Sequence, residues 1–423
     1  MSTRVTRRRA LQLGVAGTLG HFLTGPATAA ARIIGANDKI RVAGIGVGGK
    51  GSSDIEQASK IMDVVALCDI DDERLGLRGK SWPDAKKYFD YRKLFDEMAK
   101  EIDAVTVSTA DHSHAPASVR AMLLGKHVYC QKPLTHTVAE ARLMRELAAK
   151  QKVCTQMGNQ GSALSGLRRA VELIQSGTIG TVREAHVWTN RPAQYWKQSP
   201  DITARPTTTP PVPKHVHWDE WIGPAPMRPY ALAFAPRPAY HPHDWRGFWD
   251  FGTGALGDMA CHTANMAFRA LKLDAPTAVV AEAGEINPET FPAWAHIQYV
   301  FPTCTLHWYE GKRDGKKVLP PADLLGKLLK PGEKLADSGS ILVGEKGVLF
   351  SPNDYGAQFR LTPDKDFAGI QTAKPEKGPE GVDKDQDQAM KKEWADAIRA
   401  NKPELASSNF DYSGRLTEAM LLG

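Results

Sequence analysis

Three side chains in this sequence could together move a proton. Asp258 and His262 are four residues apart, so on a helix they would share one face. An imidazole oriented by a carboxylate can take the proton of a carbinol while hydride leaves its carbon. Lys132 precedes Pro133, which holds the backbone before it extended, and its ammonium group could polarise the same hydroxyl. On the residues alone, a helix-surface ion pair and a solvated strand-end lysine explain the same pattern.

An acceptor for that hydride is indicated near the start of the chain. The glycines Gly44, Gly46 and Gly49 follow an apolar strand and open a helix, with the spacing G-x-G-x-x-G. Their bare backbone permits a tight turn and close approach of a pyrophosphate to the helix N-terminus. A second strand ends at Asp69, twenty residues beyond Gly49, where a carboxylate can bind ribose hydroxyls and repel a 2′-phosphate. The pattern predicts NAD rather than NADP; the alternative is a glycine-rich turn beside a surface aspartate.

Strands and helices alternate through the first part of the chain. Further strands are expected at 104–109, 127–130 and 153–157, each after a helical segment. This βαβ rhythm predicts a doubly wound parallel sheet, an α/β Rossmann domain covering 38–160. Binding and catalytic groups in such folds lie beyond the carboxyl ends of the strands. These ends supply five further candidates for cofactor binding, which are Ser108, Thr109, His114, Gln131 and Asn159.

A second domain of α+β type is predicted over 161–423. Its sequence alternates between apolar and polar residues with a period of two, which indicates a large open, mostly antiparallel sheet with one face against helices. The strands expected in this sheet are 182–189, 278–285, 293–300 and 305–309.

A long insertion at 200–250 interrupts this domain and is rich in proline, histidine and aromatic residues. It is too long for a passive connection, and loops of this length usually cover or line sites. Trp245, Arg246 and Trp249 lead from it towards Asp258. These side chains could stack on a sugar ring and hold its hydroxyls, or the tryptophans could simply anchor the loop to the core.

Three His-x-His pairs raise the question of a metal. No tight set of cysteine, histidine and carboxylate at metal-ligand spacing accompanies them, so we expect no structural metal site. The pairs are His112/His114, His215/His217 and His241/His243.

In combination, these motifs resemble the glucose-fructose oxidoreductase and inositol dehydrogenase family, often written Gfo/Idh/MocA. The glycine fingerprint, STADHSH, CQKP and GDMACH carry the resemblance, which covers nearly all of the chain after the N-terminal segment. The usual Thr-Pro-x-x-x-His has Ala110 in place of proline, and the usual Glu-Lys-Pro has Gln131 in place of glutamate. The family's Asp-x-x-x-His is present as Asp258 and His262.

The resemblance implies hydride transfer between NAD and a saccharide or polyol, with proton transfer by Lys132 and His262 and orientation by Asp258. Gln131 removes a carboxylate that could pair with Lys132, which leaves the division of labour between Lys132 and His262 open. Because the family uses the free face of its second sheet for subunit contacts, the resemblance also implies a homodimer or homotetramer.

The first 31 residues have the three-part form of an export signal. A basic start is followed by an apolar run from Ala10 to Leu23 and by small residues at Ala27 and Ala29. The paired arginines before Ala-Leu-Gln resemble a twin-arginine signal, which serves proteins that fold before transport. A periplasmic or otherwise exported location is therefore expected, and a disordered basic arm is the weaker alternative.

Composition limits the partners of the remaining chain. The formal charge of +6 includes four arginines of the first segment and none of the acids, so about +2 remains and no nucleic acid partner is expected. No later apolar run reaches the roughly 18 residues of a membrane span, so stable membrane insertion is not expected. The five cysteines are widely spaced, without a Cys-x-x-Cys pair, and are expected to be mostly buried thiols.

Export and NAD binding together favour a particular kind of chemistry. Free NAD is scarce outside the cytoplasm, so the protein would fold around its cofactor and regenerate it internally. The leading interpretation is an exported NAD-dependent oxidoreductase acting on a saccharide or polyol. One alternative is an NAD-dependent glycoside hydrolase that works by transient oxidation, elimination, hydration and reduction. Another is a sugar-binding protein on an inactive dehydrogenase fold, against which the intact Lys132, Asp258 and His262 argue.

Overall fold

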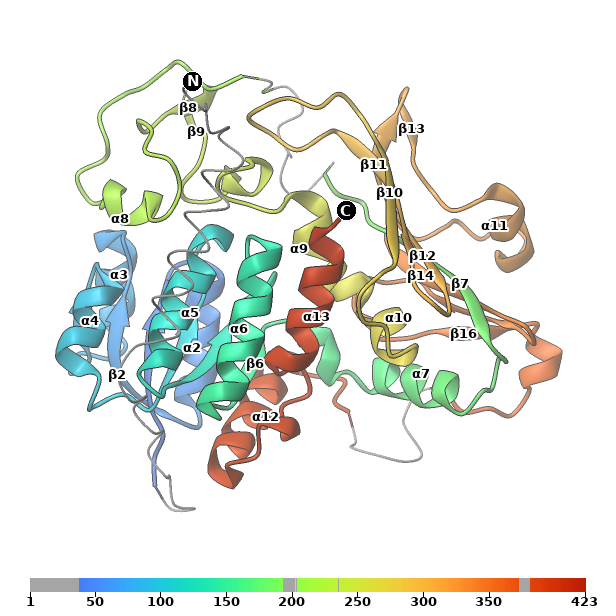
Figure 1. Ribbon diagram of the computed structural model, residues 1–423, viewed down its shortest axis with the longest axis horizontal. Coiled ribbons are helices and arrows are strands. Elements are labelled where there is room, and N and C mark those ends of the chain that lie inside the picture. Colours follow the sequence, from blue (N-terminus) through green and yellow to red (C-terminus); the bar gives the residue numbers. More distant parts are fainter. Residues whose placement is uncertain (1–37, 193–201, 203, 235, 373–380) are drawn as a thin grey trace, which may run out of the picture.

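The computed structural model describes residues 38–192, 202, 204–234, 236–372 and 381–423, so the expected export signal at 1–31 lies outside the described part of the chain. A six-stranded sheet organises the N-terminal half (Figure 1). Its strands are β1 (Arg41–Ile45), β2 (Asp63–Cys68), β3 (Lys86–Tyr88), β4 (Ala104–Val107), β5 (His127–Cys130) and β6 (Thr155–Met157). All pairings are parallel, and the order β3-β2-β1-β4-β5-β6 confirms the predicted Rossmann fold.

Local sequence signals start the helices between these strands. The Asp71 carboxylate accepts hydrogen bonds from the N–H groups of Glu73 and Arg74 at the start of α3, and Thr137 forms a capping box with Glu140 at α6. The central strands β4 and β5 are buried along their whole length, because helices cover both faces of the sheet. The helices are α2 (Lys50–Ser59), α3 (Asp72–Gly79), α4 (Tyr91–Met98), α5 (His114–Leu123) and α6 (Val138–Gln151).

A second sheet forms the other half of the molecule (Figure 1). Its strands are β7 (Val182–Trp188), β10 (Ala278–Ala283), β11 (Trp294–Val300), β12 (Thr305–Arg313), β13 (Lys316–Lys317), β14 (Gly339–Gly344), β15 (Val348–Ser351) and β16 (Arg360–Thr362). The order is β10-β11-β12-β7-β14-β15-β16, with β13 beside β12. Among these described strands β12 and β7 alone pair in parallel, which confirms the predicted, mostly antiparallel sheet.

Helices cover the two faces of this sheet unequally. Ala185, Val187 and Trp308 point to the face that shares a core with the helices α7, α9 and α10. On the other face, Trp188 and Phe350 pack with leucines of α11. These helices are α7 (Ser165–Gln175), α9 (Gly254–Thr263), α10 (Asn265–Ala270) and α11 (Ala322–Leu328).

The last two helices, α12 (Gln386–Ala400) and α13 (Phe410–Leu421), return to the first domain. Trp394 and Met390 of α12 are fully buried in one core with Ile40 and Val42, and α13 packs along α6 (Figure 1). The interpretation of 161–423 as a separate domain did not anticipate this return. The C-terminus therefore completes the Rossmann domain.

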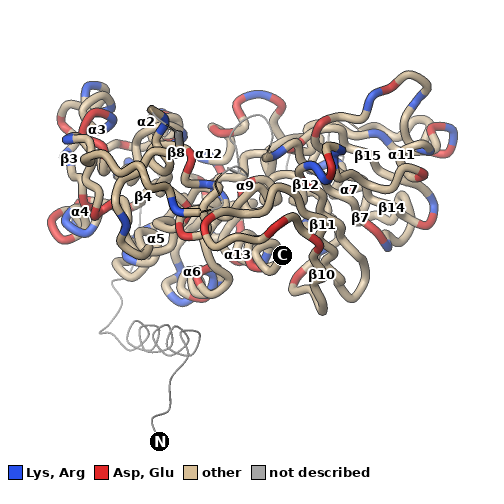
Figure 2. The backbone as a smooth tube through the Cα atoms, turned by 90° about the horizontal axis from the view of Figure 1, so that it is seen from above, with Lys and Arg blue, Asp and Glu red and all other residues tan. Residues whose placement is uncertain are grey.

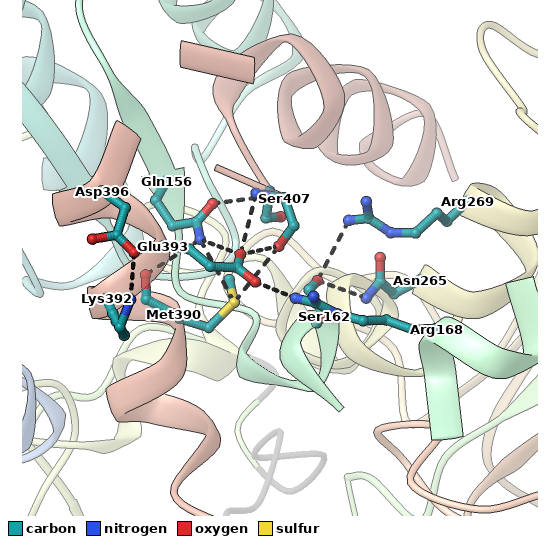
Figure 3. Close-up of polar contacts among 11 residues, drawn as sticks. Gln156, Ser162, Arg168, Asn265, Arg269, Met390, Lys392, Glu393, Asp396 and Ser407 are labelled. Carbon is teal, nitrogen blue, oxygen red and sulfur yellow. Dashed lines mark hydrogen bonds and ion pairs between the residues drawn. The ribbon is translucent and has the colours of Figure 1, made fainter. Parts of the chain in front are cut away.

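A polar network centred on Glu393 joins the two halves (Figure 3). Its carboxylate pairs with Arg168 of α7 and accepts hydrogen bonds from Ser407 Oγ at 2.6 Å and Gln156 Nε2 at 3.4 Å. Gln156 belongs to β6, so one side chain of α12 ties the first sheet to a helix of the second domain. This link fixes how the strand ends of one domain face the other.

The insertion has an aromatic core of its own, in which Trp218, Trp221 and Tyr240 bury their rings. It contains α8 (Trp218–Ile222), β8 (Leu232–Phe234) and β9 (Arg237–Pro238), and lies over the Rossmann domain near α3 (Figure 1). Two backbone hydrogen bonds of 2.8 Å hold it there, from His217 N–H to the Ile70 carbonyl and from Asp72 N–H to the His215 carbonyl. The insertion thus covers the carboxyl ends of the parallel strands.

Surface features agree with the compositional expectations. Lysine and arginine are interspersed with aspartate and glutamate over the outer helices of both domains (Figure 2). All five cysteines are buried free thiols, as predicted. Among the helices that the structure describes, none combines the length and the apolar character of a membrane span.

Candidate active site

A cleft of about 990 Å³ follows the carboxyl ends of β1, β2, β4 and β5, beneath the insertion and against α9. This volume is at the upper end of the range for small-molecule sites, about 300–1,000 Å³. It can therefore hold a ligand larger than a single sugar.

The glycine turn after β1 is shaped for a closely approaching ligand. Gly46 has a φ of +75°, and a Cβ there would lie 2.7 Å from the Ser108 carbonyl oxygen. Gly49 lines the cleft, and a Cβ there would meet no atom within 4 Å. No side chain of the described residues caps α2, so its N-terminal end is open to a pyrophosphate, although the N–H groups of Gly51 and Ser52 donate to the carbonyls of Gly48 and Gly49. Gly44 lies outside the cleft lining, and its missing side chain makes room for Val47.

Asp69 lines the cleft at the end of β2, as predicted, but it is also part of the glycine turn. Its Oδ2 accepts hydrogen bonds from the N–H groups of Val47 at 2.7 Å and Gly48 at 2.9 Å. Its Oδ1 accepts one from Asp71 N–H at 3.0 Å and keeps a lone pair for a ribose hydroxyl. The turn, the uncapped helix and this carboxylate together fit NAD.

Ser108 and Gln131 line the cleft, and each also donates a side-chain hydrogen bond to Asp54 of α2. Asp54 is fully buried, and its Oδ2 accepts from Ser108 Oγ at 2.8 Å and Gln131 Nε2 at 2.7 Å. Its Oδ1 accepts from Lys50 and Lys391, each at 2.8 Å. Burial opposes ionisation, but the two lysines outweigh it and lower the pKa of Asp54. This saturated carboxylate locks α2 to the ends of β4 and β5.

The other predicted cofactor residues have different surroundings. Thr109 and His114 line the cleft, and the His114 ring lies between the Pro133 carbonyl at 2.8 Å and the Thr109 carbonyl at 3.1 Å. His114 therefore ties the segment after Lys132 to the end of β4. Asn159 is fully buried outside the cleft lining, where its Nδ2 donates to the Cys261 carbonyl at 3.1 Å. Its amide nitrogen thus contacts α9, while its Oδ1 is buried without a hydrogen-bond partner among the described residues.

Lys132 and Asp258 meet across the domain boundary. Lys132 Nζ donates to Asp258 Oδ1 at 2.8 Å and to the Asp258 carbonyl at 2.9 Å. Arg246 Nε lies 3.6 Å from the same carboxylate oxygen. Burial would raise the pKa of Asp258, but Lys132 and Arg246 outweigh it and lower the pKa to about 2. The carboxylate is ionised and keeps the ammonium group at the cleft wall.

His262 lies one helical turn beyond Asp258 on α9, a helix with almost every residue buried. The predicted orientation of His262 by Asp258 is not observed, because the carboxylate faces Lys132 and Arg246. Nδ1 of His262 is buried without a hydrogen-bond partner among the described residues. Burial lowers the pKa of His262 well below its usual range, and Lys132 lowers it further. The imidazole is therefore neutral at pH 7.

The insertion supplies two of its three predicted substrate residues to the cleft. Trp245 and Arg246 line it, with the guanidinium 4.3 Å from the Trp245 ring. Trp249 lies outside the cleft lining, where its ring packs on Phe291 and its Nε1 donates to the Asn287 carbonyl at 3.0 Å. Trp249 thus attaches the insertion to the segment 287–291 and not to the core, since it remains 37% exposed.

Several cleft residues carry no local sequence signal. Tyr355 approaches the His262 ring edge-on at 4.6 Å, and Lys50 and Arg191 also line the cleft. Asp111 lies inside the STADHSH motif, which could have pointed to it, and its Oδ2 accepts from Thr253 Oγ1 at 2.8 Å. Burial raises the pKa of Asp111 to about 7, an effect that Arg246 opposes and Asp258 reinforces. The site thus holds two carboxyl groups, Asp111 and Asp258, whose pKa values are shifted in opposite directions.

Comparison with known proteins agrees with an NAD-binding Rossmann domain. Residues 40–159 match a family model described as an oxidoreductase family, NAD-binding Rossmann fold (GFO_IDH_MocA). Residues 167–319 match the C-terminal alpha/beta domain of the same family. The chain belongs to this oxidoreductase family. Together the two matches span more than half of the sequence, and the NAD-binding Rossmann domain is the predicted one.

Named relatives share only part of the chain. Inositol 2-dehydrogenase of Salmonella typhimurium is 30% identical over 147 residues, which cover 34% of this chain and 43% of that protein. A glycosyl hydrolase family 109 protein of Shewanella pealeana is 28% identical over 34% of this chain and 33% of its own length. The chain therefore matches less than half the length of these relatives. A solved structure, an inositol dehydrogenase homolog from Azotobacter vinelandii complexed with NADH and myo-inositol, has a TM-score of 0.58 at 16% identity, over 93% of this chain and 96% of its own.

The raised pKa of Asp111 predicts a pH-dependent cost of folding. Its carboxyl is protonated in the folded protein up to about pH 7 but ionises near pH 3.8 when exposed, so unfolding releases a proton between these values. Stability should fall as pH rises through this window. Asp111→Asn does not titrate, so its unfolding free energy lacks this pH-dependent fall. The unfolding free energy of Asp111→Asn minus that of the unsubstituted protein should therefore rise by about 2–3 kcal/mol between about pH 5 and pH 8. Urea unfolding at both pH values measures this, and a pH-independent difference would contradict it.

Asp69→Ala should weaken NAD binding. The substitution removes the acceptor of two N–H groups in the glycine turn together with the proposed ribose ligand. Loss of such charge-assisted bonds corresponds to a rise in Kd of about 10- to 100-fold. Calorimetric titration with NAD measures it, and Asp84→Ala, at an exposed residue outside the cleft lining, is the control. Equal NAD affinity in both variants would refute the assignment of Asp69.

Proposed function

We propose that the protein is an NAD-dependent oxidoreductase that acts on a hydroxyl group of a saccharide or polyol. One observation carries the proposal: a dinucleotide cradle shares its cleft with the ion pair of Lys132 and Asp258 and with the neutral imidazole of His262. A relative named inositol 2-dehydrogenase and a similar fold that holds NADH and myo-inositol support the substrate class.

The side chains divide the proton chemistry between them. NAD, when bound, supplies the hydride acceptor. His262 takes the hydroxyl proton on its neutral imidazole, and Lys132 Nζ donates a hydrogen bond to the oxygen as negative charge develops there. Asp258 holds the ammonium group in place. Arg246 and Trp245 supply a polar and an apolar surface for the sugar.

A tightly held, internally recycled cofactor is part of the proposal. Residues of the insertion line one side of the cleft, and the insertion is fastened to the loop after β2, where His241 Nε2 lies 3.0 Å from Asp71 Oδ2. Such a cover would slow the release of a bound dinucleotide. Export by a twin-arginine route, suggested by the sequence of 1–31, would then carry the loaded protein to the periplasm. A homodimer or homotetramer completes the proposal.

A second candidate is an NAD-dependent glycoside hydrolase. The similarity to a glycosyl hydrolase family 109 protein favours it as a specific alternative. Both activities begin with oxidation of a sugar hydroxyl, so the same residues would serve either. They differ in whether a glycosidic bond breaks.

One assay separates these activities. The protein is purified without added cofactor and offered myo-inositol, other polyols, aldoses and p-nitrophenyl glycosides while reduced nicotinamide and nitrophenol are recorded together. The proposal predicts reduced nicotinamide, at most one per site, and no nitrophenol. Nitrophenol over many turnovers would instead establish the hydrolase. Saccharide binding without any change in nicotinamide absorbance would refute both in favour of a binding protein, and Asp258→Asn controls for contaminating enzymes.

A further inference from the structure

A cluster of histidines lies on the face of the second sheet opposite its helical core. Ala185 and Val187 of β7 point into that core, so Glu184 and His186 point to the other face. The parallel register of β7 and β12 places His307 directly beside His186. None of the three residues Glu184, His186 and His307 lines the cleft. The cluster is thus separate from the active site.

The Glu184 carboxylate faces both imidazoles through the same oxygen. Oε1 lies 3.4 Å from His186 Nε2 and 3.3 Å from His307 Nε2, and all three atoms are within 4.8 Å of one another. Two ligand atoms bound tetrahedrally to one Zn²⁺, at about 2.0–2.1 Å each, are about 3.3–3.4 Å apart. The distances from Glu184 Oε1 to the two Nε2 atoms already equal this ligand-to-ligand distance.

Each histidine is also held through its other ring nitrogen. His186 Nδ1 lies 2.9 Å from the Tyr309 hydroxyl, and His307 Nδ1 lies 3.3 Å from His296 Nε2. Metal-binding histidines usually donate their second ring N–H to such a partner, which directs the free lone pair of the first nitrogen to the metal. The partners here leave both Nε2 atoms for a ligand.

We propose that Glu184, His186 and His307 form a binding site for a divalent transition-metal ion, with Zn²⁺ as the natural occupant. Two imidazoles and one carboxylate are a ligand set that Zn²⁺ favours, with a fourth position left for water. The ion would cross-link β7 to β12 and so stabilise the parallel pair within the otherwise antiparallel sheet. This proposal is independent of the reaction in the cleft.

In the single chain, an ion can reach the site past Glu184. His186 is buried and His307 is 14% exposed, whereas Glu184 is 44% exposed and forms the entrance. The two rings are stacked 15° from parallel and must tilt towards each other for their lone pairs to converge.

A second group, Asp71, Glu73 and His215, also brings potential ligands together. Its Asp71 is already engaged by Arg74 and His241, and its Glu73 is 75% exposed. This group therefore serves as the comparison site in the test.

The test uses the full chain with a histidine-free tag. The metal-free protein is titrated with Zn²⁺ by calorimetry and with Co²⁺ by visible absorption, which is intense for tetrahedral coordination. Glu184→Gln and His307→Gln address the proposed site, and His215→Gln is the matched control. Glu184→Gln changes a half-exposed side chain, so its fold can be verified by circular dichroism even if His307→Gln proves unstable.

The proposal predicts one tightly bound ion per chain, a tetrahedral Co²⁺ spectrum, and a Tm that rises with Zn²⁺. Glu184→Gln should weaken binding at least tenfold and abolish the Tm rise, while His215→Gln should match the unsubstituted protein. The absence of saturable binding would overturn the proposal. So would binding that survives Glu184→Gln, or binding that only His215→Gln removes.

Discussion

The ion pair between Lys132 and Asp258 is the contact on which the cleft depends. It joins the end of β5 to α9, and so joins the dinucleotide half of the cleft to the substrate half. Both side chains are largely withdrawn from water, at 18% and 9% exposure. Breaking a buried pair by removing one partner typically costs about 3–5 kcal/mol, because the other charge stays buried and unpaired. The pair therefore sets both the geometry and the charge of the site.

Two further carboxylates fix the positions of Lys132 and Asp258. Asp54 binds the ends of β4 and β5 to the helix of the glycine turn, which fixes the strand end that carries Lys132. Glu393 of α12 connects β6 to α7, which fixes the second domain against the first (Figure 3). Neither carboxylate needs to touch a ligand. Both determine where the ligand-facing groups stand.

Much of this arrangement follows from local sequence. The glycine spacing, the βαβ rhythm and the period-two strands each reflect backbone requirements that act within a few residues, and the structure confirms the folds they predict. Asp258 and His262 do share a helix, but a carboxylate binds the strongest donor within reach. That donor is Lys132, 126 residues away in sequence. The four-residue spacing predicted the helix and not the partner.

The remaining differences between the sequence predictions and the structure also arise from tertiary contacts. Asn159 follows β6 as expected but is buried against α9, and Trp249 turns towards Phe291, because packing partners decide which way a loop side chain faces. The return of α12 has no local signal, because the apolar face of a helix does not specify the surface on which it packs. The group of Glu184, His186 and His307 could not be predicted from the sequence for a similar reason. His307 reaches it only through the register of two strands far apart in the chain.

The role of Lys132 is tested most directly by the rate of nicotinamide reduction in a single turnover by Lys132→Met, with the affinity for NAD measured in parallel. Asp258→Asn combined with Lys132→Met leaves no unpaired buried carboxylate, and so separates the loss of the ammonium group from a disturbed charge balance. We predict that both variants bind NAD within about threefold of the unsubstituted protein and lose about 10²- to 10⁴-fold in rate. Full-rate reduction by either variant would contradict the role assigned to Lys132.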